Sequence, residues 1–169
     1  MFSNTITDWE SVDAHKTFMS SPGYQPFLET LKTHILAAAP TLFHVKLPID
    51  PSSPNPFSAP VTECINAYFD PSQSEEEYNA SFATFHAKAE EIPNIEATGL
   101  VGGWSDGKHQ HEGLGEGVDG KLFAAFVGWP SVEAHMEFRK TEEFLNIRGY
   151  LRTGVKGINV WHVPFTQYK

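Results

Sequence analysis

Residues 129–135 read Trp-Pro-Ser-Val-Glu-Ala-His, and residues 9–15 read Trp-Glu-Ser-Val-Asp-Ala-His. The two stretches lie 120 positions apart, and the match continues downstream. The further matched pairs are Phe18 with Phe138, Tyr24 with Phe144, Phe27 with Ile147, Leu31 with Leu151 and, after a two-residue slip, 42–45 with 160–163. Apolar positions that match at helical spacing and precede a matched short strand indicate an internal structural duplication.

Each copy reads as a strand end, a helix and a strand. Ser11 and Ser131 are good N-caps, and each is followed two residues later by an acidic residue in the first helical turn. The second copy predicts a helix over about 131–153, which glycines then end. The first copy predicts a helix over about 11–38, broken into two pieces by the prolines and glycine of 20–26.

Residues before the second helix add a strand, a helix and two strands. The segment 61–69 is rich in β-formers, 74–92 is an amphipathic helix, and 95–104 and 121–129 read as strands. The glycine-rich stretch 105–120 predicts a long mobile loop. The order β-α-β-β-α-β is that of an α+β, ferredoxin-like unit.

The chain therefore divides into three predicted segments. Residues 1–48 form half a ferredoxin-like repeat, β-α-β, with strands near 2–9 and 41–48. Residues 49–60 form a stiff, proline-rich linker, and 61–169 form a full repeat.

The motif Trp-x-Ser-x-Glu/Asp-Ala-His-x-x-Phe, placed between a strand and the second helix of such a unit, resembles the dimeric α/β-barrel superfamily. Within it, the chain looks most like the tandem-repeat, antibiotic-biosynthesis-monooxygenase-like proteins of fungal type, with the first repeat here incomplete. The resemblance implies two four-stranded sheets packed face to face as a barrel, with a ligand pocket between each sheet and its helices. In a complete ferredoxin-like unit the first strand lies between the third and fourth strands. The first copy lacks that strand, which would leave a gap between its strands near 2–9 and 41–48. We therefore expect an oligomer, most simply a homodimer, in which a partner fills the gap.

Composition excludes several classes of partner. The chain of 169 residues has 12 Lys+Arg against 21 Asp+Glu, a net charge of -9, which disfavours nucleic acids and anionic membranes. A single cysteine excludes an internal disulfide and a multi-cysteine zinc site. No secretory signal and no apolar run long enough to span a membrane is visible, so we expect a cytoplasmic protein.

Histidines are the candidate catalytic groups. His135 lies three residues from Val132 and from Phe138, on the helix face that meets the sheet, where a neutral imidazole is a suitable general base. His162 is the second candidate, although alternation along its strand predicts that the face of Trp161 meets the helices and that His162 faces the barrel interior. The alternative is that both histidines only pack and bond to protein groups.

Candidate ligand-binding residues are aromatic or polar-tipped side chains on the predicted strands and the first helix. They are Asn66, Tyr68, Phe82, Trp104, Phe126 and Trp129. Filling of the core is the alternative role for all of them.

No metal or cofactor is predicted. His109 and His111 have metal-ligand chemistry, but the surrounding glycines favour a solvated loop, or a loop that gates a pocket. Haem-degrading members of the superfamily use an Asn–Trp–His set; Asn66 fits the first member, but Phe138 and Arg148 fall where the other two belong.

The resemblance implies a protein that binds a small apolar or aromatic molecule. As an enzyme it would be a cofactor-independent monooxygenase of an aromatic or polyketide-like compound, with His135 or His162 as base, or a cofactor-free cyclase or decarboxylase of the same fold. The alternative is a non-catalytic, stress-related module for ligand binding or oligomerisation.

Overall fold

A computed structural model of the protein describes residues 5–34 and 41–166. The chain forms two compact units, Met1–His44 and Val45–Lys169. This division falls near the predicted end of the half repeat at residue 48, and the two units are described separately below.

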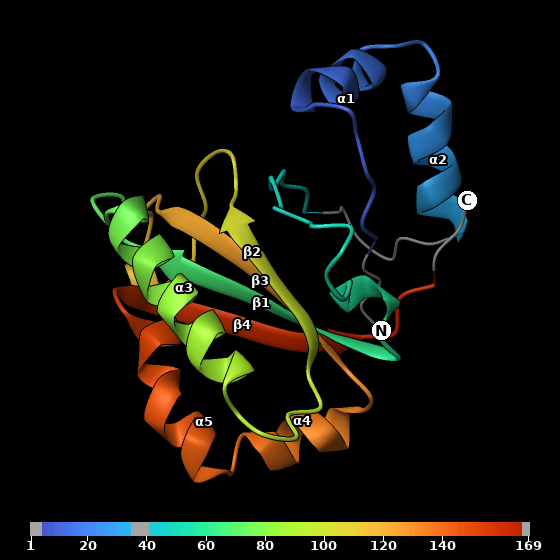
Figure 1. The fold of residues 1–169 in the computed structure, drawn as a ribbon. Helices are drawn as coiled ribbons and strands as arrows, with labels where there is room; N and C mark the ends of the chain where they lie inside the picture. Colours follow the sequence, from blue (N-terminus) through green and yellow to red (C-terminus); the bar gives the residue numbers. More distant parts are fainter. Residues whose placement is uncertain (1–4, 35–40, 167–169) are drawn as a thin grey trace. The chain divides into compact units, whose positions relative to one another are not determined.

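The larger unit contains one antiparallel sheet of four strands in the order β2-β3-β1-β4 (Figure 1). Its strands are β1 (Val61–Phe69), β2 (Thr98–Trp104), β3 (Lys121–Trp129) and β4 (Val155–Val163). This order and the β-α-β-β-α-β succession are ferredoxin-like, which confirms the fold class predicted from the sequence.

Helices cover one face of this sheet. Helix α3 (Glu75–Glu90) begins at Ser74, whose hydroxyl accepts the Glu77 N–H. The single helix predicted over 131–153 is instead three pieces, namely α4 (Val132–Phe138), α5 (Glu142–Ile147) and the 3-10 helix η3 (Arg148–Arg152). The break arises because Thr141 accepts the Phe144 N–H and so starts a new helix.

Aromatic side chains fill the space between α3 and the sheet. Tyr78 of α3 packs edge-on against Phe69 of β1 and Phe123 of β3, with ring centroids 4.5 and 4.9 Å apart. Trp104 joins this cluster at the end of β2, and its indole N–H donates to the Asn79 side chain at 2.8 Å. Burying these large rings is a main source of stability for the unit.

The proline-rich segment is more structured than the predicted linker. It includes the 3-10 helix η1 (Pro56–Ser58), in which Pro56 is buried and accepts the Thr62 hydroxyl at 2.8 Å through its carbonyl. Val45 forms an isolated bridge with Ser105. The segment 45–58 therefore packs beside β2 at the sheet edge, and we call it the strap.

Gly99 of β2 allows the strap to approach closely. Its φ of 70° is in the left-handed region, and a Cβ there would overlap the Pro54 carbonyl. Gly107 has a φ of 92°, but a Cβ added there would meet no atom within 4 Å. It therefore shares the backbone constraint of Gly99 without the crowding.

We expect Gly99→Ala to destabilise the larger unit by about 2 kcal/mol more than Gly107→Ala, because only the first substitution also displaces the strap. Urea unfolding of the two variants measures this difference. Equal losses would show that the strap does not hold Gly99 closely.

The stretch 105–120 has more structure than a mobile loop. A bridge joins His109 to Gly120, and the 3-10 helix η2 (Glu112–Leu114) follows. His111 accepts the Gly113 N–H at 2.9 Å and stacks on Tyr68, with ring centroids 4.4 Å apart. This loop therefore covers part of the sheet near Tyr68.

The smaller unit contains two helices, α1 (Val12–Met19) and α2 (Tyr24–His34), which confirms the predicted break. The strands predicted near 2–9 and 41–48 are not formed in the described residues 5–9 and 41–48, apart from the bridge at Val45. The β-α-β half repeat is therefore wrong for the described residues, because a strand needs a partner to pair with and residues 5–34 and 41–44 form no sheet.

Candidate functional site

A cavity of about 490 Å³ lies in the larger unit, between the helix-bearing face of the sheet and the helices. The size and the mostly apolar lining are those of a small-molecule site. Apolar side chains form most of its walls, among them Ile65, Phe82, Phe85, Ile95, Leu100, Phe123, Val127, Phe138, Phe144, Leu151, Ile158 and Val160. The strap closes one side through Pro48, Ile49, Pro54 and Pro56.

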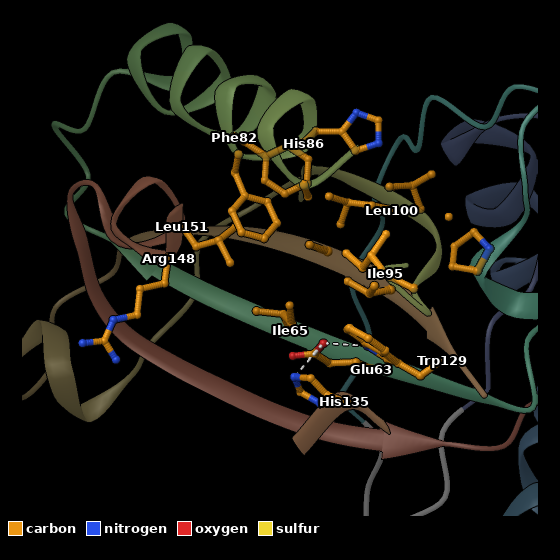
Figure 2. A pocket seen from close by; sticks show the side chains of 18 of the residues that line it. Glu63, Ile65, Phe82, His86, Ile95, Leu100, Trp129, His135, Arg148 and Leu151 are labelled. Carbon is orange, nitrogen blue, oxygen red and sulfur yellow. Dashed lines mark hydrogen bonds and ion pairs between the residues drawn. The ribbon is translucent and has the colours of Figure 1, made fainter. Parts of the chain in front are cut away.

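Glu63 is a carboxyl group in this apolar surrounding, and only 7% of the residue is exposed. Figure 2 shows Glu63, Trp129 and His135 joined by dashed contacts on the cavity wall. The Trp129 indole N–H donates to Glu63 Oε2 at 3.1 Å, and His135 Nε2 lies 3.3 Å from the same oxygen. His135 Nδ1 is in turn 2.7 Å from His162 Nε2.

The local fold explains why these four residues meet. Glu63 of β1 is directly opposite His162 of β4, and in the register with β3 it is two residues from the Val61–Trp129 pair. Directly opposite and diagonal neighbours on one face are within reach of long side chains. The Ser131 hydroxyl caps α4 by accepting the Ala134 N–H at 3.1 Å, which turns His135 toward the sheet, where it stacks on Trp129.

Burial sets the protonation of this group of residues. It raises the pKa of Glu63 to about 7, although the Trp129 hydrogen bond and the Arg139 charge oppose the shift. Burial likewise lowers the pKa of His135 to about 4, and the His162 and Arg139 charges add to that effect. The pKa of His162 is also lowered, first by burial and then by Arg139. Each shift favours the neutral form, as expected where water is excluded.

The chain of contacts has two proton arrangements. With Glu63 ionised, His135 donates from Nε2 to the carboxylate and accepts from His162 Nε2 at its Nδ1. With Glu63 protonated, Glu63 donates to His135 Nε2, and His135 donates from Nδ1 to His162. In the arrangement with Glu63 ionised, His135 and His162 both donate toward the carboxylate, which leaves Glu63 as the group of this chain that accepts a proton.

The two Glu63 oxygens differ in their surroundings. Oε2 has both protein partners, whereas Oε1 makes no hydrogen bond within the described residues. Figure 2 shows this second oxygen turned away from Trp129 and His135. Both ring nitrogens of His135 are engaged by protein, so the polar atom of this group that is open to a ligand belongs to Glu63.

The structure places three of the sequence candidates, Phe82, Trp129 and His135, on the cavity wall. His162 does not line the cavity, and its Nε2 lies 2.7 Å from Nδ1 of His135, which does.

The other candidates lie elsewhere. Asn66 and Tyr68 alternate with the cavity-lining Ile65 and Ala67 and so belong to the opposite face of the sheet. Phe126 packs against Phe57, with centroids 5.0 Å apart, and Trp104 is in the aromatic cluster under α3.

The predicted orientation of β4 is wrong. His162 faces the helices, because it bonds to His135 of α4, and Trp161 consequently lies on the opposite face. Both faces of this strand carry apolar residues, so alternation separates the two sets without showing which set meets the helices.

Glu63 was not among the residues singled out in the sequence. The signal that identifies it is a carboxyl group in the middle of a strand of β-formers, at the same parity as Ile65 and Ala67. A charged residue that is buried in a strand costs free energy unless it has a partner, so such a residue indicates either a partner or a function.

The smaller unit repeats part of this geometry. Trp9 stacks on His15 with centroids 4.3 Å apart, and His15 Nδ1 lies 2.7 Å from His44 Nε2, the same distance as in the larger unit. No carboxylate contacts His15 within residues 5–34 and 41–44. The duplicated motif thus supplies a Trp–His–His set, and Glu63 is what the larger unit adds.

No group of three or more His, Cys, Asp or Glu side chains that would hold a metal ion occurs within residues 5–34 and 41–166. His109 instead contacts the Ser105 hydroxyl. Likewise, no helix in the described part of the chain has the length and apolar character needed to cross a membrane.

Comparison with known proteins places the fold. No family model matches the sequence, and no curated protein matches it significantly. A structure from Lactobacillus acidophilus, described as a candidate monooxygenase, matches 91% of this chain and 65% of its own with a TM-score of 0.51 at 10% identity.

Smaller proteins match at lower scores. SnoaB, a cofactor-independent oxygenase from Streptomyces nogalater, is 15% identical with a TM-score of 0.44, over 65% of this chain and 97% of its own. A dimeric ferredoxin-like protein of unknown function from Bacteroides fragilis is 12% identical with a TM-score of 0.41, over 62% and 96%. The match at a TM-score of 0.51 agrees with the fold described above. The homodimer and the cytoplasmic location remain predictions for this chain.

Proposed function

We propose that the larger unit binds a small apolar or aromatic molecule in its cavity and removes a proton from it with Glu63. The observation that carries this proposal is the carboxyl oxygen Oε1, open on a mostly apolar wall, with Oε2 held by Trp129 and His135. A general base is most effective when its pKa is near the working pH, and burial raises the pKa of Glu63 to about 7.

His135 and His162 are positioning groups in this proposal. His135 orients the carboxyl by donating from Nε2 to Oε2, and His162 holds that tautomer by donating from its Nε2 to His135 Nδ1. This changes the role expected from the sequence, in which His135 contacted the substrate directly.

Oxygenation is the reaction we favour for the deprotonated molecule. A ring carbonyl conjugated with the CH₂ group can delocalise the carbanion formed next to Glu63, and this electron-rich anion reduces dioxygen itself. A ring CH₂ group and O₂ then give a ring carbonyl and water, through a hydroperoxide that loses water. In this scheme the substrate supplies the electrons, so the protein has to bind the ring, take the proton and exclude bulk water.

A non-catalytic ligand-binding module is the second candidate. It is favoured by the fact that both nitrogens of His135 have protein partners, as a packing histidine would. The two candidates share the cavity and differ in whether Glu63 moves a proton.

Ligand binding is tested with N-phenyl-1-naphthylamine, a neutral aromatic dye that fluoresces in apolar surroundings. We expect the dye to bind, and Val160→Trp to weaken it about tenfold, because Val160 lines the cavity and is 42% exposed, so the larger ring enters the cavity without crowding the core. Leu145→Trp is the matched control, since Leu145 is 44% exposed on α5 and does not line the cavity. Equal effects of the two variants, or no binding by the wild type, would contradict the proposal.

A further inference from the structure

All three arginines of the chain, Arg139, Arg148 and Arg152, line the cavity. The described lysines are absent from its lining. In a protein with a net charge of -9, the guanidinium groups are thus gathered at one apolar site.

The three arginines are exposed, and no partner in the part of the chain that the structure describes fixes their side chains. None of them makes an ion pair or a side-chain hydrogen bond within residues 5–34 and 41–166. The exposed pairs of the chain are made by lysines or by a histidine, such as Lys140 with Glu137 at 2.6 Å. The fork of N–H donors on each arginine is therefore available to a ligand.

The carboxyl groups of the lining do not neutralise the arginines. Asp50 accepts hydrogen bonds from the backbone N–H and the hydroxyl of Ser52. Glu90 Oε1 lies 3.8 Å from His86 Nε2. Glu63 is bonded to Trp129 and His135.

The arginines divide between two parts of the wall. Arg139 follows α4, close enough to His135 and Glu63 for its charge to lower the pKa of both groups. Arg148 and Arg152 begin and end η3. Figure 2 shows Arg148 at the other end of the view from Trp129, with its guanidinium directed away from Glu63 and toward the cavity's edge.

We infer that the ligand of this cavity is an organic carboxylate, whose apolar body lies between sheet and helices and whose charged group is held by Arg148 and Arg152. This inference rests on the proposed function, because it names the class of molecule that the same cavity binds. Arginine binds carboxylates through two parallel hydrogen bonds, which fix orientation as well as affinity. Anchoring the carboxylate at η3 leaves the rest of the molecule to reach Glu63.

The test uses displacement of N-phenyl-1-naphthylamine from the full chain by 2-naphthoate and by its neutral counterpart 2-naphthamide. We expect 2-naphthoate to bind about tenfold more tightly than 2-naphthamide, and added salt to reduce the difference. Decanoate, compared with decanamide, shows in the same assay whether the apolar body is aromatic or aliphatic. Either an aromatic or an aliphatic body supports the inference, provided that the acid binds more tightly than its amide.

The double variant Arg148→Met, Arg152→Met should abolish the preference for the acid while the dye still binds. Methionine keeps much of the apolar stem and removes the charge. The double variant Lys140→Met, Lys156→Met makes the same change in net charge away from the cavity and should keep the preference. Circular dichroism of both variants checks that they are folded.

Equal binding of acid and amide, or equal weakening by the two double variants, would overturn the carboxylate assignment while dye binding left the proposed function intact. Failure of the wild type to bind the dye would instead remove the proposed function and this inference together.

Discussion

Replacing Glu63 by Gln should slow proton abstraction by at least about 100-fold, because the amide keeps the shape of the side chain but cannot take a proton. A neutral carbon acid, 5-nitrobenzisoxazole, reports this step directly. The base removes the ring C–H proton, the N–O bond breaks, and a coloured cyanophenolate forms. We expect the wild-type rate to rise with pH as the carboxyl ionises around its pKa of about 7.

Binding of the neutral dye should stay within about twofold in Glu63→Gln, which separates loss of the base from loss of the cavity. Glu96→Gln is the control, because Glu96 is exposed and does not line the cavity. A Glu63→Gln variant that keeps the wild-type rate would exclude this carboxyl as the base. A wild type that binds the dye but does not accelerate the elimination would favour the non-catalytic module.

The Trp-x-Ser motif and local sequence patterns made much of the fold of the larger unit predictable. The matched Trp-x-Ser motif correctly gave the capped helices, since the hydroxyls of Ser11 and Ser131 both accept the N–H three residues on. Local sequence patterns were sufficient to predict β1 and β3 as well. Both strands are marked by their own apolar composition and by turn residues close to them in the sequence.

Pairing in space decided the features that the sequence did not reveal. The matched residues 41–48 read as a strand because they resemble those of β4, but β4 forms against β1, and the described part of the smaller unit has no such neighbour. Local propensity cannot supply that neighbour. The same limit explains why a copied motif did not produce a copied half repeat.

The candidate site shows most clearly that local sequence patterns do not determine which residues meet in space. The sequence indicated that His135 faces the sheet, which is correct, but the group it faces was set by register. Glu63 meets His135 because β1 lies between β3 and β4 with Glu63 opposite His162. Asn66 and Tyr68 were expected in the pocket because of their chemistry. They lie an odd number of residues from Glu63 along β1, so the alternation of side chains places them on the opposite face of the sheet.

The same carboxyl–imidazole pair predicts an unusual dependence of stability on pH. The pKa of Glu63 is raised from 4.5 to about 7, so between these values the folded protein holds a proton that the unfolded chain has lost. This contribution lowers stability as pH rises. The pKa of His135 is lowered from 6.5 to about 4, so between these values the unfolded chain holds the extra proton, and this contribution raises stability as pH rises. From pH 4.5 to 6.5 the two slopes oppose each other and cancel.

Removing one partner should expose the slope of the other. Glu63→Gln should gain about 3 kcal/mol of stability relative to the wild type between pH 4.5 and pH 7, because a shift of one pKa unit corresponds to about 1.4 kcal/mol. The difference between the two urea-unfolding profiles isolates Glu63, since all other groups contribute equally to both proteins. His135→Gln should show the opposite trend, losing about 3 kcal/mol relative to the wild type between pH 4 and pH 6.5.

The sign of the Glu63→Gln difference decides where the proton resides. A neutral pair, with the proton on Glu63 and a neutral His135, makes the variant relatively more stable as pH rises. An ion pair of carboxylate and imidazolium would lower the pKa of Glu63, and the variant would then lose stability relative to the wild type as pH rises to 4.5, with no gain between pH 4.5 and pH 6.5. That second outcome would also contradict the kinetic prediction, because a carboxylate paired with an imidazolium remains ionised through pH 7 and its rate would not rise there. Only the neutral pair leaves Glu63 titrating near neutral pH, where accepting and releasing a proton cost about the same free energy.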